Sequence, residues 1–265
     1  MIISVINHAT QDLDDAAVQL ALRAINRQLA EDFAPAWHLE ARLRLEGKST
    51  AAPTVKSLPD LRGDAVLYLW DGSDVEDALG YHDRNARGVP YGFVFTRLSQ
   101  QLGESWTVTL SHEALEMAVD PHVNLLVQGP HPADADATVF HWYEVCDAVQ
   151  AETYTIDGIA VANFLLPLYF TGEGEPGSRN AFEGRSDADP LVSFGINPGG
   201  YVGFFNPATG RHEVASQPGD ALAARRLALK RRYGRGRRGA RYQQPARPPR
   251  PRALAAVDVI SSRLA

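Results

Sequence analysis

Apolar and polar positions alternate with different periods along the chain, and these periods predict the first structural elements. Residues 2–6 and residues 65–70 are short apolar runs of the kind found in buried strands. Residues 12–30 repeat apolar side chains at helical spacing, so we expect a helix there that ends before Pro35. Residues 38–46 alternate apolar and charged side chains, which predicts a half-exposed strand.

The middle of the chain predicts a second helix over residues 106–119, which ends at Asp120 and Pro121. Before it, the polar residues 79–90 predict a loop and residues 91–96 predict a short strand. After it we expect irregular β structure: a β-like segment over 140–149, a hairpin turn at Asp157-Gly158, a long loop over 171–190 and a hairpin over 199–214.

This order of elements predicts an α+β fold in which a mixed sheet packs on two helices and irregular β segments follow. Three regions are expected. Residues 1–121 form an α+β subdomain, residues 122–220 form an irregular β-rich subdomain, and residues 221–265 form a basic tail rich in Arg, Gly and Pro.

Composition narrows the class of protein. A hydrophobic fraction of 45% and a charged fraction of 22% are typical of a globular chain. The single cysteine, Cys146, excludes an internal disulfide framework and a Cys-rich zinc module, and we interpret it as structural. No apolar run is long enough to span a membrane and the N-terminal residues lack a secretory signal, so we expect a cytoplasmic protein or one in a particle assembled there.

Charge is distributed very unevenly. The stretch from Arg225 to Arg252 holds twelve Lys and Arg and no acid, whereas residues 1–224 hold 13 basic and 31 acidic residues, a balance of −18. Such a tail can bind nucleic acid through its phosphates or an acidic protein surface, and it favours a subunit of a large assembly. The arginines at its centre are the candidate contacts: Arg231, Arg232, Arg235, Arg237, Arg238 and Arg241.

The candidate chemistry lies on the helix predicted over residues 106–119. His112, Glu116 and Asp120 are spaced at i, i+4 and i+8, so their side chains share one helix face. Imidazole nitrogens and carboxylate oxygens are ordinary ligands of zinc, manganese and iron. Glu113, adjacent to the first ligand, is placed to accept a proton from water at such a cation.

A cation at this helix needs a third ligand. Asp120 lies ~12 Å along the helix from His112, which is too far for one shared ion unless the helix ends first. Glu144 and Asp147 follow in the chain, and we favour Glu144 with Asp147 second. Asp120 and Asp147 stay as additional ligands or as residues that orient the ligands.

The string His112-Glu113-Ala114-Leu115-Glu116 resembles the HExxH motif of the zincin metallopeptidases, with Glu116 where that family has a second His. The resemblance covers residues 1–121, because a helix and a mostly parallel sheet precede the active-site helix in zincins. It implies a zinc-dependent peptidase with His112 as first ligand, Glu116 at the second ligand position and Glu113 as general base. The strings SHEALE, DPHVN and YEVCD are also similar to a group of uncharacterised bacterial and phage proteins.

Two other interpretations stand beside this one. A helix of this composition can present a solvated face with i,i+4 ion pairs, and the cluster His82-Asp83-Arg84 can be a surface network of ion pairs or a contribution to a cleft. The chain can also be a non-catalytic structural subunit that uses the basic tail for assembly. The expected partners are therefore a peptide substrate, an acidic protein surface or nucleic acid, and no membrane.

Overall fold

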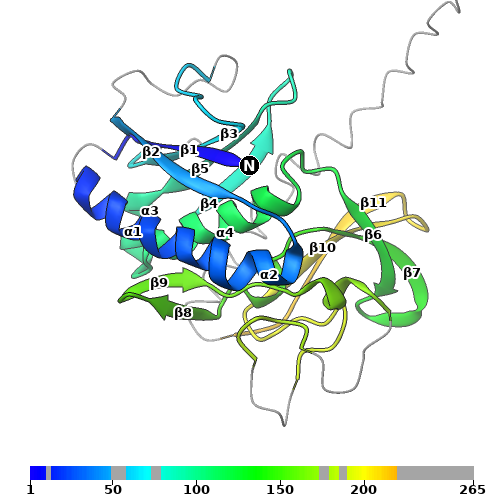
Figure 1. Ribbon diagram of the computed structural model, residues 1–265. Coiled ribbons are helices and arrows are strands. Elements are labelled where there is room, and N and C mark those ends of the chain that lie inside the picture. The colour runs from blue at the N-terminus through cyan, green and yellow to red at the C-terminus, as the bar shows by residue number, and fades with distance from the viewer. Residues whose placement is uncertain (10–12, 49–57, 73–78, 173–178, 185–189, 220–265) are drawn as a thin grey trace, which may run out of the picture.

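The computed structural model describes residues 1–9, 13–48, 58–72, 79–172, 179–184 and 190–219. It has the α+β fold expected from the sequence, with helices packed against sheets (Figure 1). Within the described ranges, none of the helices combines the length and the apolar character needed to cross a membrane.

A five-stranded sheet with the order β2-β1-β3-β5-β4 forms the N-terminal half. Neighbouring strands are parallel except for the edge strand β4, which is antiparallel to β5. The strands are β1 (Ile2–Asn7), β2 (Arg42–Lys48), β3 (Ala65–Trp70), β4 (Gly80–Arg84) and β5 (Pro90–Phe95).

The two long helices are α1 (Asp15–Arg27) and α4 (Trp106–Val119). Both lie between the five-stranded sheet and a two-stranded hairpin made of β8 (Thr153–Ile156) and β9 (Ile159–Ala162) (Figure 1). Because side chains alternate across a strand, Leu67 and Leu69 of β3 face these helices whereas Tyr68 faces an aromatic cluster on the opposite side of the sheet.

A four-stranded antiparallel sheet with the order β11-β10-β7-β6 lies in the C-terminal half of the described chain. Its strands are β6 (Leu126–His131), β7 (Asp134–Trp142), β10 (Tyr201–Asn206) and β11 (Arg211–Ser216). Val139, Val202 and Phe204 of this sheet belong to the same hydrophobic core as Val5 and Leu115. The two subdomains expected on either side of residue 121 therefore share one core.

Some local predictions were wrong. The polar stretch 79–90 contains strand β4, and a short helix not expected from the sequence, α3 (Thr96–Leu102), follows β5. The first helix does not end before Pro35: after α1 the chain continues as a π-helix, η1 (Gln28–Phe33), and then as α2 (Ala34–Trp37), which includes Pro35. Proline fits the first turn of a helix, where its missing N–H would have no partner.

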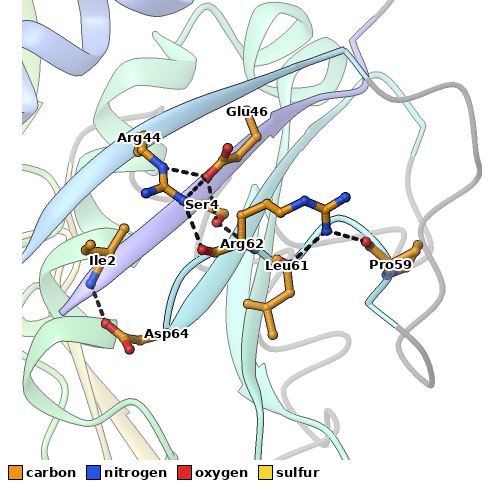
Figure 2. A network of polar contacts seen from close by, with 8 residues as sticks. All are labelled: Ile2, Ser4, Arg44, Glu46, Pro59, Leu61, Arg62 and Asp64. Carbon is orange, nitrogen blue, oxygen red and sulfur yellow. Dashed lines mark hydrogen bonds and ion pairs between the residues drawn. The ribbon is translucent and has the colours of Figure 1, made fainter.

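Polar contacts fix the segment before β3 against β1 and β2 (Figure 2). The Ser4 hydroxyl lies 3.1 Å from Glu46 Oε1 and accepts the backbone N–H of Arg62 over 3.1 Å. Arg44 donates to Glu46 Oε1 over 2.7 Å and to the Arg62 carbonyl over 2.9 Å. Because the Arg44 side chain is 45% exposed, its ion pair contributes little to stability. We assign this network a local structural role.

Candidate metal centre

Helix α4 carries the predicted motif and is held firmly on two sides. Its N-cap is Ser105, whose side chain accepts the Thr107 N–H. The Thr107 hydroxyl donates to the Ala160 carbonyl over 2.6 Å, and Ser111 Oγ accepts the Ala162 N–H over 2.7 Å. These bonds fix the helix on β9, so the side chains on its other faces have defined positions.

His112 and Glu116 meet on one face of α4, as their spacing requires. His112 Nε2 lies 3.2 Å from Glu116 Oε1 and 3.3 Å from Asp147 Oδ1. Glu116 and Asp147 are buried, and the His112 side chain is 14% exposed. The three donor atoms lie within 4.8 Å of one another, so this group, the His112 group, can hold a metal ion.

Asp147 reaches the helix from a turn after β7. It begins a 3-10 helix, η2 (Asp147–Val149), and the preceding residue Cys146 donates its backbone N–H to Glu116 Oε1 over 3.2 Å. The Cys146 thiol contacts the His112 carbonyl at 3.8 Å. The turn is thus fastened to α4 beside the two helix ligands, and this places the Asp147 carboxylate against His112.

A second group with metal-binding geometry lies next to the first and includes His82, which the sequence did not assign to the site. Its donors are His82, Glu113 and Glu116, all buried, with donor atoms within 4.8 Å of one another. His82 Nδ1 lies 3.1 Å from Glu113 Oε2 and 3.7 Å from Glu116 Oε2. We call this the His82 group.

His82 faces α4 because successive side chains of strand β4 point to opposite faces of the sheet. Tyr81 packs against Tyr91 and Phe93 on the aromatic face, so its neighbour His82 faces the helix. Gly80 permits the close approach: a Cβ at this position would lie 2.6 Å from Thr109 Cγ2 and 3.2 Å from Glu113 Oε1. The interpretation of His82-Asp83-Arg84 as a surface network was wrong for His82 and Asp83, because both are buried.

The carboxylates dominate the electrostatics of this region. Burial by itself would lower the pKa of His112, but Glu116, Asp147 and Glu113 outweigh burial and raise that pKa well above its ordinary value. Burial, and then the negative charges of these residues and of Glu144, also raise the pKa of the Cys146 thiol. Cys146 therefore keeps its proton, which agrees with a structural role and not with that of a thiolate ligand.

The other predicted ligands lie outside both groups. The Asp120 carboxylate accepts the backbone N–H groups of Asn124 and Leu125, each over 2.8 Å, and so caps the turn that follows α4. Glu144 is buried, and its charge acts on Cys146, but the geometry joins Asp147 and not Glu144 to His112 and Glu116. Arg231, Arg232, Arg235, Arg237, Arg238 and Arg241 lie outside the described residues.

The donor distances fit a cation. Two ligand atoms that share a tetrahedral zinc ion at ~2.0–2.1 Å lie ~3.3 Å apart. The separations of 3.2 and 3.3 Å in the His112 group match this value. The same two contacts are hydrogen bonds when His112 is protonated, and they contribute to its raised pKa. One imidazole and two carboxylates also suit manganese or iron.

Compared with family models, with curated proteins and with solved structures, the chain matches none.

Proposed function

We propose that the protein is a metal-dependent hydrolase in which His112, Glu116 and Asp147 hold one divalent cation and Glu113 is the general base. The observation that carries the proposal is the convergence of one imidazole and two buried carboxylates at distances that suit shared coordination. Burying carboxylates costs free energy unless positive charge compensates them, so such a group is more typical of function than of stability.

The residues of this site have separate roles in the proposed reaction. A divalent cation bound there would supply a Lewis acid for the bond to be cleaved. Glu113 is the next residue on the helix, and its carboxylate would take a proton from the attacking water and pass it to the leaving group. His82, 3.1 Å from Glu113 Oε2, holds that carboxylate in place. Cys146 fixes the orientation of Glu116 through its backbone N–H.

The resemblance to zincin metallopeptidases refines the proposal to zinc and to a peptide substrate. In its support, a mostly parallel sheet and a helix precede α4 in the chain, which is the order that the resemblance implies. In the proposed site Glu116 takes the second ligand position instead of a His, and Asp147 takes the third.

A comparison of two variants tests the proposal. His112→Ala should lose the cation of the His112 group, because it removes the only nitrogen donor of that group. Glu113→Gln should keep that cation but lose peptide hydrolysis, because the amide is nearly isosteric and cannot accept the proton.

His122→Ala, which changes an exposed histidine, is the matched control. Elemental analysis and hydrolysis of peptide pools are the measurements. Metal-free wild type, or equal hydrolysis by wild type and Glu113→Gln, contradicts the mechanism.

The uneven charge supports a second role, in assembly or nucleic-acid binding. The stretch from Arg225 to Arg252 carries twelve basic residues and no acid. Residues 1–224 carry 13 basic and 31 acidic residues, a net charge of −18. If the tail binds phosphates, deletion of residues 225–265 should abolish retention of DNA, and retention by the full chain should fall steeply with salt. Retention that does not change with salt or with the deletion contradicts this role.

A further inference from the structure

We propose that the His82 group is a second divalent-cation subsite, so that the protein binds a pair of cations bridged by Glu116. The inference rests on the proposed function in one respect, since both subsites use the Glu116 carboxylate. The second subsite differs from the first in its other ligands, His82 and Glu113. Its histidine comes from strand β4, whereas His112 lies on helix α4.

The two oxygens of Glu116 face different histidines. Oε1 lies 3.2 Å from His112 Nε2, and Oε2 lies 3.7 Å from His82 Nδ1. A carboxylate in this position can bind one cation through each oxygen, which is the arrangement that two-cation hydrolases require of a bridging residue.

The His82 group also has the donor set and the spacing of a cation site. His82 Nδ1 and Glu113 Oε2 are 3.1 Å apart, close to the ~3.3 Å expected of two ligands on one tetrahedral ion. The side chains of His82, Glu113 and Glu116 are 0%, 7% and 2% exposed, so this group is more deeply buried than His112. A mixed imidazole and carboxylate set at this depth is more typical of a metal site than of a solvated ion pair.

Charge favours the second cation as well. Three buried carboxylates, those of Glu113, Glu116 and Asp147, belong to these two neighbouring groups. One divalent cation in the His112 group neutralises two negative charges. A second one in the His82 group would neutralise the remainder, where burial makes uncompensated charge costly.

The Glu113 side chain can serve both assignments through different atoms. Oε2 faces His82, whereas Oε1 lies toward Gly80 on β4. A carboxylate that binds a cation through one oxygen keeps a second oxygen that can accept a proton. Both proposals therefore keep Glu113 as the base and differ in how many cations the chain binds.

Counting bound cations in the full chain decides the question. The protein is stripped with a chelator, titrated with Mn²⁺ and separately with Zn²⁺, and analysed for metal after free ions are removed. Wild type and the control His122→Ala should bind two cations per chain. His82→Asn and Glu113→Gln should each bind one, and His112→Ala should also bind one. Glu113→Gln is nearly isosteric, so it decides the result if His82→Asn fails to fold.

The outcomes separate the two proposals. One cation in wild type, retained in both His82→Asn and Glu113→Gln, overturns the second subsite and leaves the first, with His82 acting only to position Glu113. One cation that is lost in these two variants but retained in His112→Ala overturns the first subsite and leaves the His82 group as the metal site. No bound cation in wild type overturns both.

Discussion

His112 and His141 are both withdrawn from water, but their surroundings are opposite in character. His112 lies against Glu116 and Asp147, and these carboxylates overcome the effect of burial and raise its pKa. His141, on β7, packs against the rings of Phe194 and Phe204 and donates its Nε2–H to the Pro130 carbonyl over 2.8 Å. Burial lowers the pKa of His141, and the bond to Pro130 offsets this only in part.

The contrast shows that the partners of a buried histidine decide its role. An imidazole among carboxylates compensates negative charge and can exchange its proton for a cation. An imidazole among aromatic rings stays neutral and serves as a packing group with one hydrogen bond. Substitutions in the two regions should therefore separate metal binding from stability.

The largest expected effect is on metal binding in Glu116→Gln. The amide keeps the shape of the side chain and can still accept the Cys146 N–H, but it removes the anionic ligand that both groups share. Affinity for Mn²⁺ should fall by more than ~100-fold, the upper range for residues that only orient ligands. The free energy of unfolding of the metal-free protein should change little, because the lost pairing with His112 is offset by weaker repulsion among the buried carboxylates.

Isothermal titration and urea denaturation measure these two quantities, with the exposed Asp136→Asn as the control. Unchanged affinity in Glu116→Gln would falsify the role of this residue.

The second largest effect is expected for His141→Ala, which should lower stability and leave metal binding unchanged. Truncation leaves a cavity between Phe194 and Phe204 and deprives the Pro130 carbonyl of its donor. The free energy of unfolding should fall by about 2–4 kcal/mol, as for other large buried side chains. The amount of bound metal in the folded protein should not change. Loss of metal from folded His141→Ala would contradict the assignment of metal binding to the His112 region and of packing alone to the His141 region.

The smallest effect is a dependence of stability on pH. The folded-state pKa of His141 is lowered, whereas an imidazole in the unfolded chain has a pKa of about 6.5. Below that pH the unfolded state binds more protons, so the free energy of unfolding falls as the pH falls toward the folded-state pKa, and the full contribution is present above about 6.5.

His141→Phe, which keeps an aromatic ring but does not titrate, should reduce this slope by up to ~1.4 kcal/mol per pH unit. Urea denaturation between about pH 5 and 7.5 measures the slope for both proteins. Identical slopes would show that His141 is not the group responsible.

Local sequence was sufficient for the parts of the site that lie on one helix. The bounds predicted for α4 and β3 agree with the structure, because Ser105 caps α4 and β3 is a continuous apolar run. The convergence of His112 and Glu116 follows from helical spacing alone. These features depend only on residues close together in the chain.

The parts of the site that depend on tertiary packing were not predicted. Strand β4 has a polar sequence, and its burial comes from β5 and α4, so the pattern gave no sign that His82 faces the helix. The choice between Glu144 and Asp147 depends on the 3-10 turn that begins at Asp147, and sequence spacing does not reveal its direction. The short polar stretch with Gly80 and His82 between two apolar segments was the available signal for β4.

The donors of the two groups come from distant parts of the chain: Glu113 lies 31 positions after His82, and Asp147 lies 35 positions after His112. Closing such loops is entropically costly, so the donors meet only after β4 and the turn at Asp147 have docked on α4. An unfolded chain offers no equivalent arrangement, and under the proposed function a cation binds the native state selectively. At 100 times its dissociation constant it would add ~2.7 kcal/mol to the free energy of unfolding. Metal supply would then govern how long each molecule survives proteolysis.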